Sequence, residues 1–222
     1  MLYVISLGGS LIVPEAIDVR FLKNFRTCII KNLKKNKFVI IAGGGKTARK
    51  YIEAATKIYK IASEDKDWLG IHATRLNAHL LRTIFRDYAH PRIITNPKEK
   101  IKFKEKILIA AGWRPGFSTD YDAVLIAKNL GSKRLINITD LDYIYTKDPK
   151  QFKDAKPIKR ATWDELIKIL PKRWSPGLHT PFDPVAARLA KKIGLTLFSI
   201  GPSIENLKNL LKAKAFKGTI VA

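Results

Sequence analysis

Three short apolar runs in this sequence stop at glycine, and a helical pattern follows each of them. The runs are Tyr3 to Leu7, Phe38 to Ala42 and Ile107 to Ala111, and they end at Gly8, Gly43 and Gly112. Strands of this kind, apolar along their whole length and separated by helices, are typical of a parallel sheet that is covered on both faces. The pattern therefore predicts an α/β fold with a mostly parallel central sheet.

Helical spacing of apolar residues fills most of the remaining chain. We predict helices over residues 18–35 and 67–88, with Asp18 as N-cap of the first, and shorter ones over 123–130, 163–170, 184–193 and 205–211. In the helix over 67–88 we expect one inward stripe, made of Leu69, His72, Leu76, His79, Leu80 and Ile84. Later strands are expected at 135–138, 195–200 and 218–221. No linker divides the chain, so we expect a single domain over residues 1–222.

Composition excludes several classes of protein. With 46% hydrophobic residues the 222-residue chain can build a core, and it contains no run of about 20 apolar residues that could cross a membrane. The single cysteine, Cys28, cannot form an internal disulfide, and we expect a cytoplasmic protein. The formal charge of +23 favours an anionic partner, which is either nucleic acid or a phosphate-bearing substrate.

Lysine occupies every second position from Lys98 to Lys106. In an extended segment these five lysines share one face, while Ile101 and Phe103 point the other way. We favour an edge strand that its charge protects from pairing with another chain. The alternative is a docking stripe for a polyanion.

The glycine turns favour a phosphate ligand. In parallel α/β sheets ligands bind at the carboxyl ends of the strands, where glycine lets the backbone approach an anion. The segment from Gly43 to Thr47 ends like a Walker A loop, but Ile40 stands where that motif needs its first glycine. The same segment fits a dinucleotide-binding fingerprint only formally, because it follows the second strand instead of the first.

A group of aspartates lies between residues 120 and 148, in a chain with only 19 acidic residues. Its members are Asp120, Asp122, Asp140, Asp142 and Asp148. Carboxylates beside a triphosphate can hold Mg²⁺ or orient lysines and water. The competing interpretation is structural, with Asp120 as a helix cap and Asp148-Pro149 as the start of a turn.

The motifs have a characteristic order. They are Gly8-Gly9-Ser10, Gly43-Gly44-Gly45-Lys46 with Ala48-Arg49-Lys50-Tyr51, Asp67 with Gly70-Ile71 and Thr74-Arg75 and Asn77-Ala78, Pro115-Gly116 with Ser118-Thr119-Asp120, Thr139-Asp140-Leu141-Asp142 with Tyr145-Thr146 and Asp148-Pro149, and Phe182-Asp183-Pro184 with Ala186-Ala187. This series resembles the amino acid kinase superfamily, and within it the archaeal-like branch of uridylate (UMP) kinases. The resemblance extends from residue 3 to about residue 220.

The resemblance implies a three-layer αβα sandwich that transfers the γ-phosphoryl group of ATP to UMP with Mg²⁺, in pyrimidine nucleotide biosynthesis. It places the acceptor side in about residues 1–115 and the ATP side in about 116–222. It also implies a homo-oligomer, a hexamer in this family, with ATP and UMP as its small-molecule partners.

The resemblance also implies functional residues, because each family motif can be matched to the corresponding motif in this sequence. The implied ATP-binding residues are Gly8, Gly9, Ser10, Gly45, Arg49, Thr139, Asp140, Tyr145 and Asp148. The implied UMP-binding residues are Gly44, Asp67, Trp113, Arg114, Pro115, Gly116, Phe117, Ser118 and Thr119. The implied catalytic set is Gly9, Ser10, Lys46, Arg49 and Asp120, and no protein residue is predicted to ligate a metal.

Four departures from the family pattern bear on the acceptor. Ser6 stands where many members have lysine, and Lys46 is our candidate for the replacing cation. Phe117, Tyr143 and the pair Trp113-Arg114 also differ from the usual residues. The segment Trp174 to Pro181 is interpreted as a lid or a contact between subunits. Two alternatives to a UMP kinase remain. One is another phosphotransferase of the superfamily, and the other is a degenerate member that acts as a nucleic-acid-binding or regulatory protein.

Overall fold

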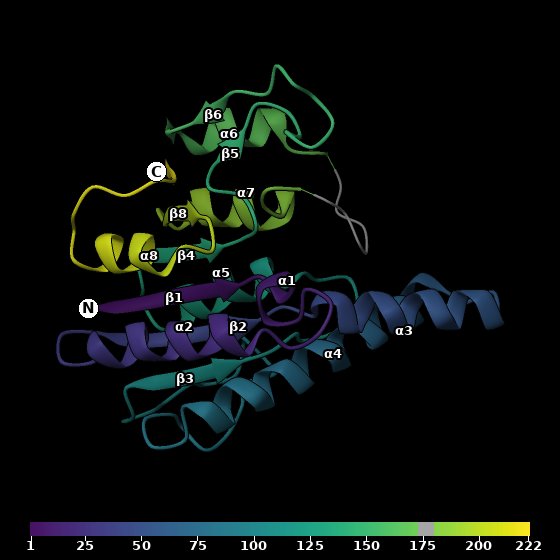
Figure 1. Cartoon of the computed structure of the whole chain (residues 1–222), viewed down its shortest axis with the longest axis horizontal. Helices are drawn as coiled ribbons and strands as arrows, with labels where there is room; N and C mark the ends of the chain where they lie inside the picture. Colours follow the sequence, from purple (N-terminus) through teal and green to yellow (C-terminus); the bar gives the residue numbers. More distant parts are fainter. Residues whose placement is uncertain (173–179) are drawn as a thin grey trace.

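A computed structural model describes residues 1–172 and 180–222 of the chain, and a central sheet of seven strands runs through it (Figure 1). In spatial order the strands are β3 (Ile107–Ala110), β2 (Lys37–Ala42), β1 (Leu2–Leu7), β4 (Arg134–Ile138), β8 (Thr196–Ile200), β9 (Thr219–Val221) and β7 (Arg160–Ala161). All neighbouring pairs are parallel except β8 and β9. The predicted mostly parallel sheet is confirmed.

Two apolar cores sandwich this sheet. Ile5 and Ile40 point to the core beneath α2 (Val19–Lys31), α4 (Ser63–Ile84) and α8 (Ile204–Leu211). Val4 and Val39 point to the core beneath α5 (Thr119–Asn129), α6 (Trp163–Ile169) and α7 (Pro184–Lys192). Successive residues of a strand face opposite sides, so strands that are apolar throughout supply both cores. The three-layer αβα sandwich is therefore confirmed.

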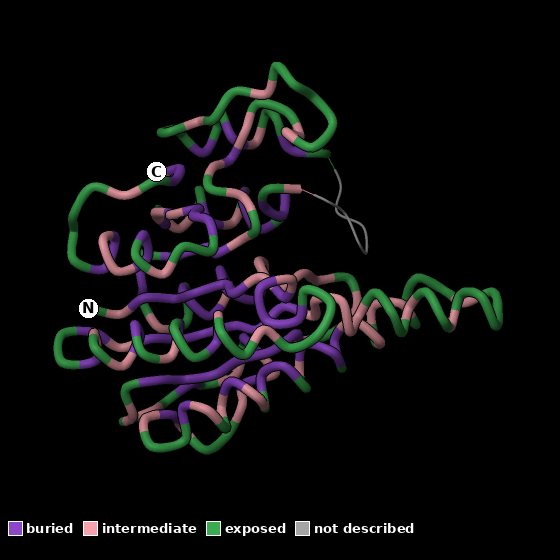
Figure 2. The backbone as a smooth tube through the Cα atoms, in the orientation of Figure 1, coloured by how far each residue is buried: buried purple, intermediate pink, exposed green. Residues whose placement is uncertain are grey.

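The helix α3 (Gly45–Ile58) packs against α4 and not against the sheet. Figure 1 shows α3 and α4 continuing beyond the edge of the sheet, and none of the residues of α3 is buried within the chain (Figure 2). Apolar residues at helical spacing form one stripe along α3, and none of them is buried by the described residues: Ala48, Tyr51, Ile52, Ala55 and Ile58.

The inward face of α4 differs from the one predicted. His72, Leu76 and His79 are exposed, whereas the buried positions are Ile71, Ala73, Thr74, Asn77, Ala78 and Leu81. The predicted stripe followed the large apolar residues and histidines. The actual inward face includes Thr74 and Asn77 because these polar side chains bind the backbone of the glycine turns.

Two helix starts test the predicted caps. Asp18 accepts a hydrogen bond from Phe21 N at 2.8 Å and caps α2 as expected. The N-cap of α5 is Ser118, which accepts from Tyr121 N at 3.1 Å, so the interpretation of Asp120 as a cap is wrong. Asp120 lies in the first turn of the helix and is left for another role.

The predicted edge strand over the lysine-rich segment is wrong: Lys98 lies in a turn, and the next strand begins only at Ile107. All five lysines from Lys98 to Lys106 are exposed, while Ile101 is buried and Phe103 packs on the core. The alternation predicted for this segment is therefore correct. The segment leads into β3, which is the edge strand of the sheet.

Smaller elements complete the molecule. A one-turn helix, α1 (Gly9–Ile12), follows β1, and a two-stranded antiparallel sheet joins β5 (Ile144–Tyr145) to β6 (Pro157–Ile158). No helix in the described ranges combines the length and apolarity needed to cross a membrane. Most of the segment interpreted as a lid, residues 174–179, lies outside the described residues.

Candidate active site

The first two glycine turns pack directly on each other where β1 and β2 end. A Cβ atom on Gly9 would lie 2.1 Å from the amide nitrogen of Gly45, and one on Gly43 would lie 2.4 Å from the nitrogen of Gly9. Gly45 also has a φ of +63°, a conformation that residues with a Cβ rarely adopt. Only glycine allows this contact between backbones, which we call the glycine junction (Gly8, Gly9, Gly43, Gly44 and Gly45).

Neighbouring elements fix the junction in place. Gly8 N donates to Ile138 O at 2.9 Å, which ties the first turn to β4. The buried side chain of Asn77, from α4, donates to Gly43 O at 2.7 Å and to Gly44 O at 3.2 Å. The helix α3 begins at Gly45, so the positive end of its dipole lies at the junction. An anionic group is the ligand that such a site favours.

The predicted cations follow on the first turns of α3. Lys46 Nζ pairs with the Glu15 carboxylate at 3.0 Å, and Lys46 N donates to Val13 O at 2.9 Å. The pKa of Glu15 is lowered, chiefly by its hydrogen bond with Lys46 and also by the charges of Lys50 and Arg49. Arg49 is exposed and makes no ion pair with any described residue.

Ser6 and Asp120 meet beneath the junction. Ser6 Oγ donates to Asp120 Oδ1 at 2.9 Å, so the residue that stands in place of lysine binds the predicted catalytic carboxylate. Burial raises the pKa of Asp120 to about 6; the hydrogen bond from Ser6 opposes this rise, and the charge of Asp183 adds to it. Asp120 is therefore a carboxyl group that titrates near neutral pH, which is common in functional sites.

The third glycine turn opens the segment Trp113–Thr119, which we call the acceptor loop. Its rings form a row, in which the centroids of Trp113 and Phe117 are 5.2 Å apart and those of Phe117 and Tyr121 are 4.9 Å apart. The Arg114 guanidinium lies 4.3 Å from the centroid of Trp113 and 5.1 Å from that of Phe117. Lys98 Nζ lies 5.0 Å from the Trp113 ring. The bulky residues that depart from the family pattern thus pack together with two cations.

Helix α4 holds the acceptor loop from one side. Thr74 Oγ1 accepts from Gly112 N at 2.8 Å, and the Asp67 carboxylate accepts from Gly116 N at 2.8 Å. Burial raises the pKa of Asp67, although its hydrogen bond from Gly116 lowers it. Gly116 has a φ of +85°, which suits glycine at the bend of the loop. Asp67, predicted to contact the UMP ribose, is thus placed at this loop.

A different contact holds the end of the loop. Ser118 Oγ donates to the buried Asp183 carboxylate, which also accepts from Val185 N and Ala186 N at the start of α7. Asp183 is thus both the N-cap of α7, for which an aspartate followed by proline is a favoured start, and an anchor for the acceptor loop.

The residues predicted to bind the adenine nucleotide form a separate group after β4. Thr139 N donates to Ile200 O at 3.0 Å, and Asp140 pairs with Lys150 Nζ at 2.6 Å. Asp148 accepts from Lys150 N at 2.9 Å, as a turn-forming aspartate does. The pKa of Lys150 is raised, chiefly by its hydrogen bond with Asp140. Tyr145 lies in β5, with its ring against Tyr143.

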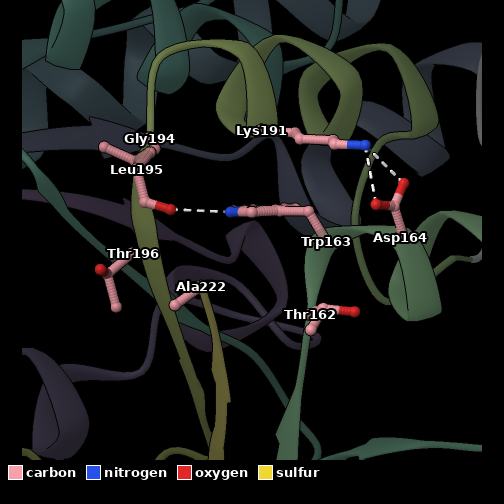
Figure 3. A pocket seen from close by; sticks show the side chains of 8 residues that line it. All are labelled: Thr162, Trp163, Asp164, Lys191, Gly194, Leu195, Thr196 and Ala222. Atoms are coloured by element: carbon pink, nitrogen blue, oxygen red, sulfur yellow. Dashed lines mark hydrogen bonds and ion pairs between the residues drawn. The ribbon is translucent and has the colours of Figure 1, made fainter.

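The structure adds residues that sequence reasoning did not assign to the site. Thr74, Arg75 and Asn77 from α4, and Asp122 on the other face, bind backbone atoms of the turns, and Asp183 binds the side chain of Ser118. Four of them stand in the ordered motifs and Asp122 stands in the aspartate group, but neither pattern shows which atom each side chain binds. A cavity of about 280 Å³ lies elsewhere, at the amino end of β8 beside the Asp164–Lys191 ion pair (Figure 3).

Glycine turns gathered at the carboxyl ends of parallel strands in a three-layer sandwich define an α/β protein that binds a phosphate-bearing ligand. The profile of the amino acid kinase family matches residues 1–198. The chain therefore belongs to the amino acid kinase family.

Individual relatives are similar over nearly the whole chain. It is 37% identical to a uridylate kinase of Pyrococcus abyssi, with 90% of each chain covered, and 34% identical to one of Thermococcus kodakarensis, with 100% of this chain and 99% of the relative covered. The crystal structure of uridylate kinase from Archaeoglobus fulgidus superposes with a TM-score of 0.85 at 28% identity, over the full length of both chains. The resemblance inferred from the motifs is confirmed.

Proposed function

We propose that the protein is an ATP-dependent UMP kinase, a phosphotransferase that converts UMP to UDP in pyrimidine nucleotide biosynthesis. The observation that carries the proposal is the glycine junction at the strand ends, beside an arginine-bearing loop, in a chain whose full-length relatives are uridylate kinases. Phosphoryl transfer requires positioning and charge neutralisation more than covalent chemistry, and this arrangement supplies both.

The proposed roles follow the position of each group. The junction and Ser10 receive the phosphates of ATP, and Thr139, Asp140, Tyr145 and Asp148 hold its nucleoside. The acceptor loop and Asp67 hold UMP, which puts the acceptor side in about residues 1–115 and the ATP side in about 116–222. Lys46 and Arg49, at the start of α3, neutralise charge between the two phosphates, and Asp120 orients the polar groups beside them.

In the proposed reaction an oxygen of the UMP phosphate attacks the γ-phosphorus of ATP. The bond from that phosphorus to the β–γ bridging oxygen breaks, and ADP leaves with the bonding electrons. In the junction the N–H groups of Gly8 and Gly43 already donate to Ile138 O and Leu7 O. We therefore assign stabilisation of the charge on the transferring group to the N–H groups of Gly9, Gly44 and Gly45 and to the side chain of Arg49. For Lys46 to assist, its pair with Glu15 must open, and this exposed ion pair is weak enough to do so.

Magnesium enters this proposal as part of the nucleotide. We propose that the phosphates of ATP carry the ion, because Mg²⁺ prefers oxygen ligands and is commonly bound together with substrate phosphates. Bound there, the ion neutralises negative charge on the β- and γ-phosphates. We also propose a cytoplasmic location, consistent with the single, buried and free Cys28.

A coupled assay tests the proposed function. With Mg²⁺ and ATP, the protein is offered UMP, CMP, AMP and GMP, and we expect UMP to be the preferred acceptor. Preference for a substrate of another family member, such as isopentenyl phosphate, carbamate or aspartate, would replace the acceptor and keep the fold. No turnover with any acceptor, together with tight binding of RNA or DNA, would support the nucleic-acid alternative instead.

Substitutions on α3 test the proposed positions of the charges. Arg49→Ala should lower kcat about 100-fold or more, because one charge-assisted contact to the transferring group is lost. Lys57→Ala is the matched control, since it removes a cation two turns further along the same helix, where Glu53 is the one acidic partner that Lys57 has in the described part of the chain. Equal activities of the two variants would contradict the assignment of Arg49.

A further inference from the structure

Two ionic side chains bind the two backbone groups of Trp113, the first residue of the acceptor loop. Asp122 Oδ2 accepts from Trp113 N at 3.0 Å, and Arg75 Nη2 donates to Trp113 O at 3.1 Å. Asp122 belongs to α5 and Arg75 to α4, which cover opposite faces of the sheet. Trp113 is thus held from both helical layers at once, and we call the three residues the Trp113 clamp.

The Trp113 clamp lowers the stability of the folded state, because it leaves buried polar atoms without hydrogen-bond partners. The Asp122 side chain is completely buried, and its second oxygen, Oδ1, has no hydrogen-bond partner among the described residues. Arg75 Nε is also buried without a partner there. A buried polar atom without a partner is unfavourable, because folding removes its hydrogen bonds to water and puts nothing in their place. An apolar residue at position 122 would avoid that cost, so stability alone does not account for this carboxylate.

What the clamp provides is a fixed position for the rest of the acceptor loop. Trp113 carries the Arg114 guanidinium and the Lys98 ammonium against its ring, and Phe117 packs on the same ring. A rotation of the Trp113 peptide would therefore move the cations of the loop together with its rings. Effective positioning of a bound substrate is sensitive to displacements of about 1 Å.

We propose that Asp122 and Arg75 are positioning residues for the acceptor, which act by fixing the peptide of Trp113 and through it the loop that receives the UMP phosphate and base. This inference rests on the proposed function. It assigns neither residue to the chemical step, so the expected effect is on acceptor binding and not on the rate at saturation.

Two substitutions of Asp122 separate the hydrogen bond from the charge. Asp122→Asn keeps an oxygen for Trp113 N and should leave the KM for UMP within about threefold of the original value. Asp122→Leu removes the hydrogen-bond acceptor of Trp113 N and should raise the KM for UMP about 10- to 100-fold, while the KM for ATP stays within about twofold. In the same way, Arg75→Met should raise the KM for UMP, and Arg75→Lys, which can still donate one bond, should restore part of the loss.

Ser132→Ala is the matched control. Ser132 is also buried and also holds backbone, through a bond to Leu2 O at 2.9 Å, but it lies beyond the other end of α5 at the amino edge of the sheet. Its loss should lower stability and leave both KM values unchanged. A purely structural role for Asp122 predicts the same pattern, so an unchanged KM for UMP in Asp122→Leu would overturn the proposal.

Hydrogen exchange gives a readout that does not depend on turnover. The backbone amides of residues 112–119 should exchange faster in Asp122→Leu and in Arg75→Met than in the unmodified protein. In Asp122→Asn they should exchange as slowly as in the unmodified protein. If the unmodified protein fails to phosphorylate UMP while the variants show this exchange pattern, the proposed function is contradicted and the Trp113 clamp is still supported. If exchange is the same in all variants, the clamp falls whatever the activity. Should Asp122→Leu not fold, Arg75→Met decides between these outcomes.

Discussion

The buried Asp122 makes stability depend on pH. Burial, opposed by the hydrogen bond from Trp113 and reinforced by the charges of Asp183 and Asp120, raises the pKa of Asp122 from 3.8 to about 7. The folded state therefore binds this proton more tightly than the unfolded state does. Stabilisation from the bound proton is complete below about pH 4 and is lost as the pH rises through 7.

Asp122→Asn removes this titration and keeps an acceptor for Trp113 N. We expect Asp122→Asn to raise the free energy of unfolding by up to about 4 kcal/mol at pH 8 and by only about 1 kcal/mol at pH 4.5. Urea denaturation at the two pH values measures the difference. Ser132→Ala, which removes no titrating group, should shift stability equally at both. If Asp122→Asn raises the free energy of unfolding equally at both pH values, the charge of Asp122 is not the cause of the increase.

At the level of single residues, the sequence revealed backbone requirements better than polar contacts. Gly9 and Gly43 were recognisable because a turn at a strand end uses glycine for a local reason, and the structure adds that their backbones touch. Asp122 and Asn77 were not assigned to the site, because the sequence does not show which backbone group a polar side chain reaches, whether that group is nine residues away, as for Asp122, or 34 away, as for Asn77. Their partners exist only once the sheet has brought the helices and turns together.

Among the elements, strands and caps were predictable and the orientation of long helices was not. The strand ends follow from apolar runs bounded by glycine, and the caps of α2 and α7 follow from aspartates at their starts. The inward face of α4 was misplaced because part of that face is polar and binds the glycine turns. A hydrophobic pattern cannot reveal a face that is buried for its hydrogen bonds.

The start of α7 links helix stability to the acceptor loop, and a pair of cap substitutions can separate the two. Asp183→Ala removes the cap of α7 and the partner of Ser118, whereas Thr162→Ala removes the cap of α6, where Thr162 accepts from Glu165 N at 3.2 Å. Each should lower the free energy of unfolding by about 1 kcal/mol. Only Asp183→Ala should also raise the KM for UMP. Thermal unfolding and steady-state kinetics measure both effects, and a normal KM in Asp183→Ala would separate the cap from the loop.

For the whole molecule, the charge of +23 is unevenly spread along the chain. Within residues 51–80 four basic side chains balance four acidic ones: Lys57, Lys60, Lys66 and Arg75 against Glu53, Glu64, Asp65 and Asp67. This segment covers most of α3 and α4, and it also exposes Tyr51, Ile58, Trp68 and Leu76. We call the exposed surface of residues 51–80 the α3–α4 face. Two copies of so basic a protein would repel each other over most of their surface, but not through this face, whose charges balance.

We propose that the protein forms a homo-oligomer, a hexamer as the family resemblance implies, and that copies meet through the α3–α4 face. The helix α3 is amphipathic yet has no buried residue within its own chain, so its apolar stripe is available to a second copy. Large apolar side chains at the centre of an interface contribute most of its binding energy. A charge placed among them should therefore disrupt association.

The double variant Ile58→Glu and Leu76→Glu should separate the copies, because two carboxylates would be buried without partners at their contact. Size-exclusion chromatography with light scattering should then show the mass of one chain, where the unmodified protein shows a multiple of it. Ile169→Glu is the control, since Ile169 is an exposed apolar residue of α6, away from this face, and it should leave the mass unchanged. A double variant that keeps the mass of the unmodified oligomer would place the interface elsewhere, and an unmodified protein with the mass of one chain would refute the proposed assembly.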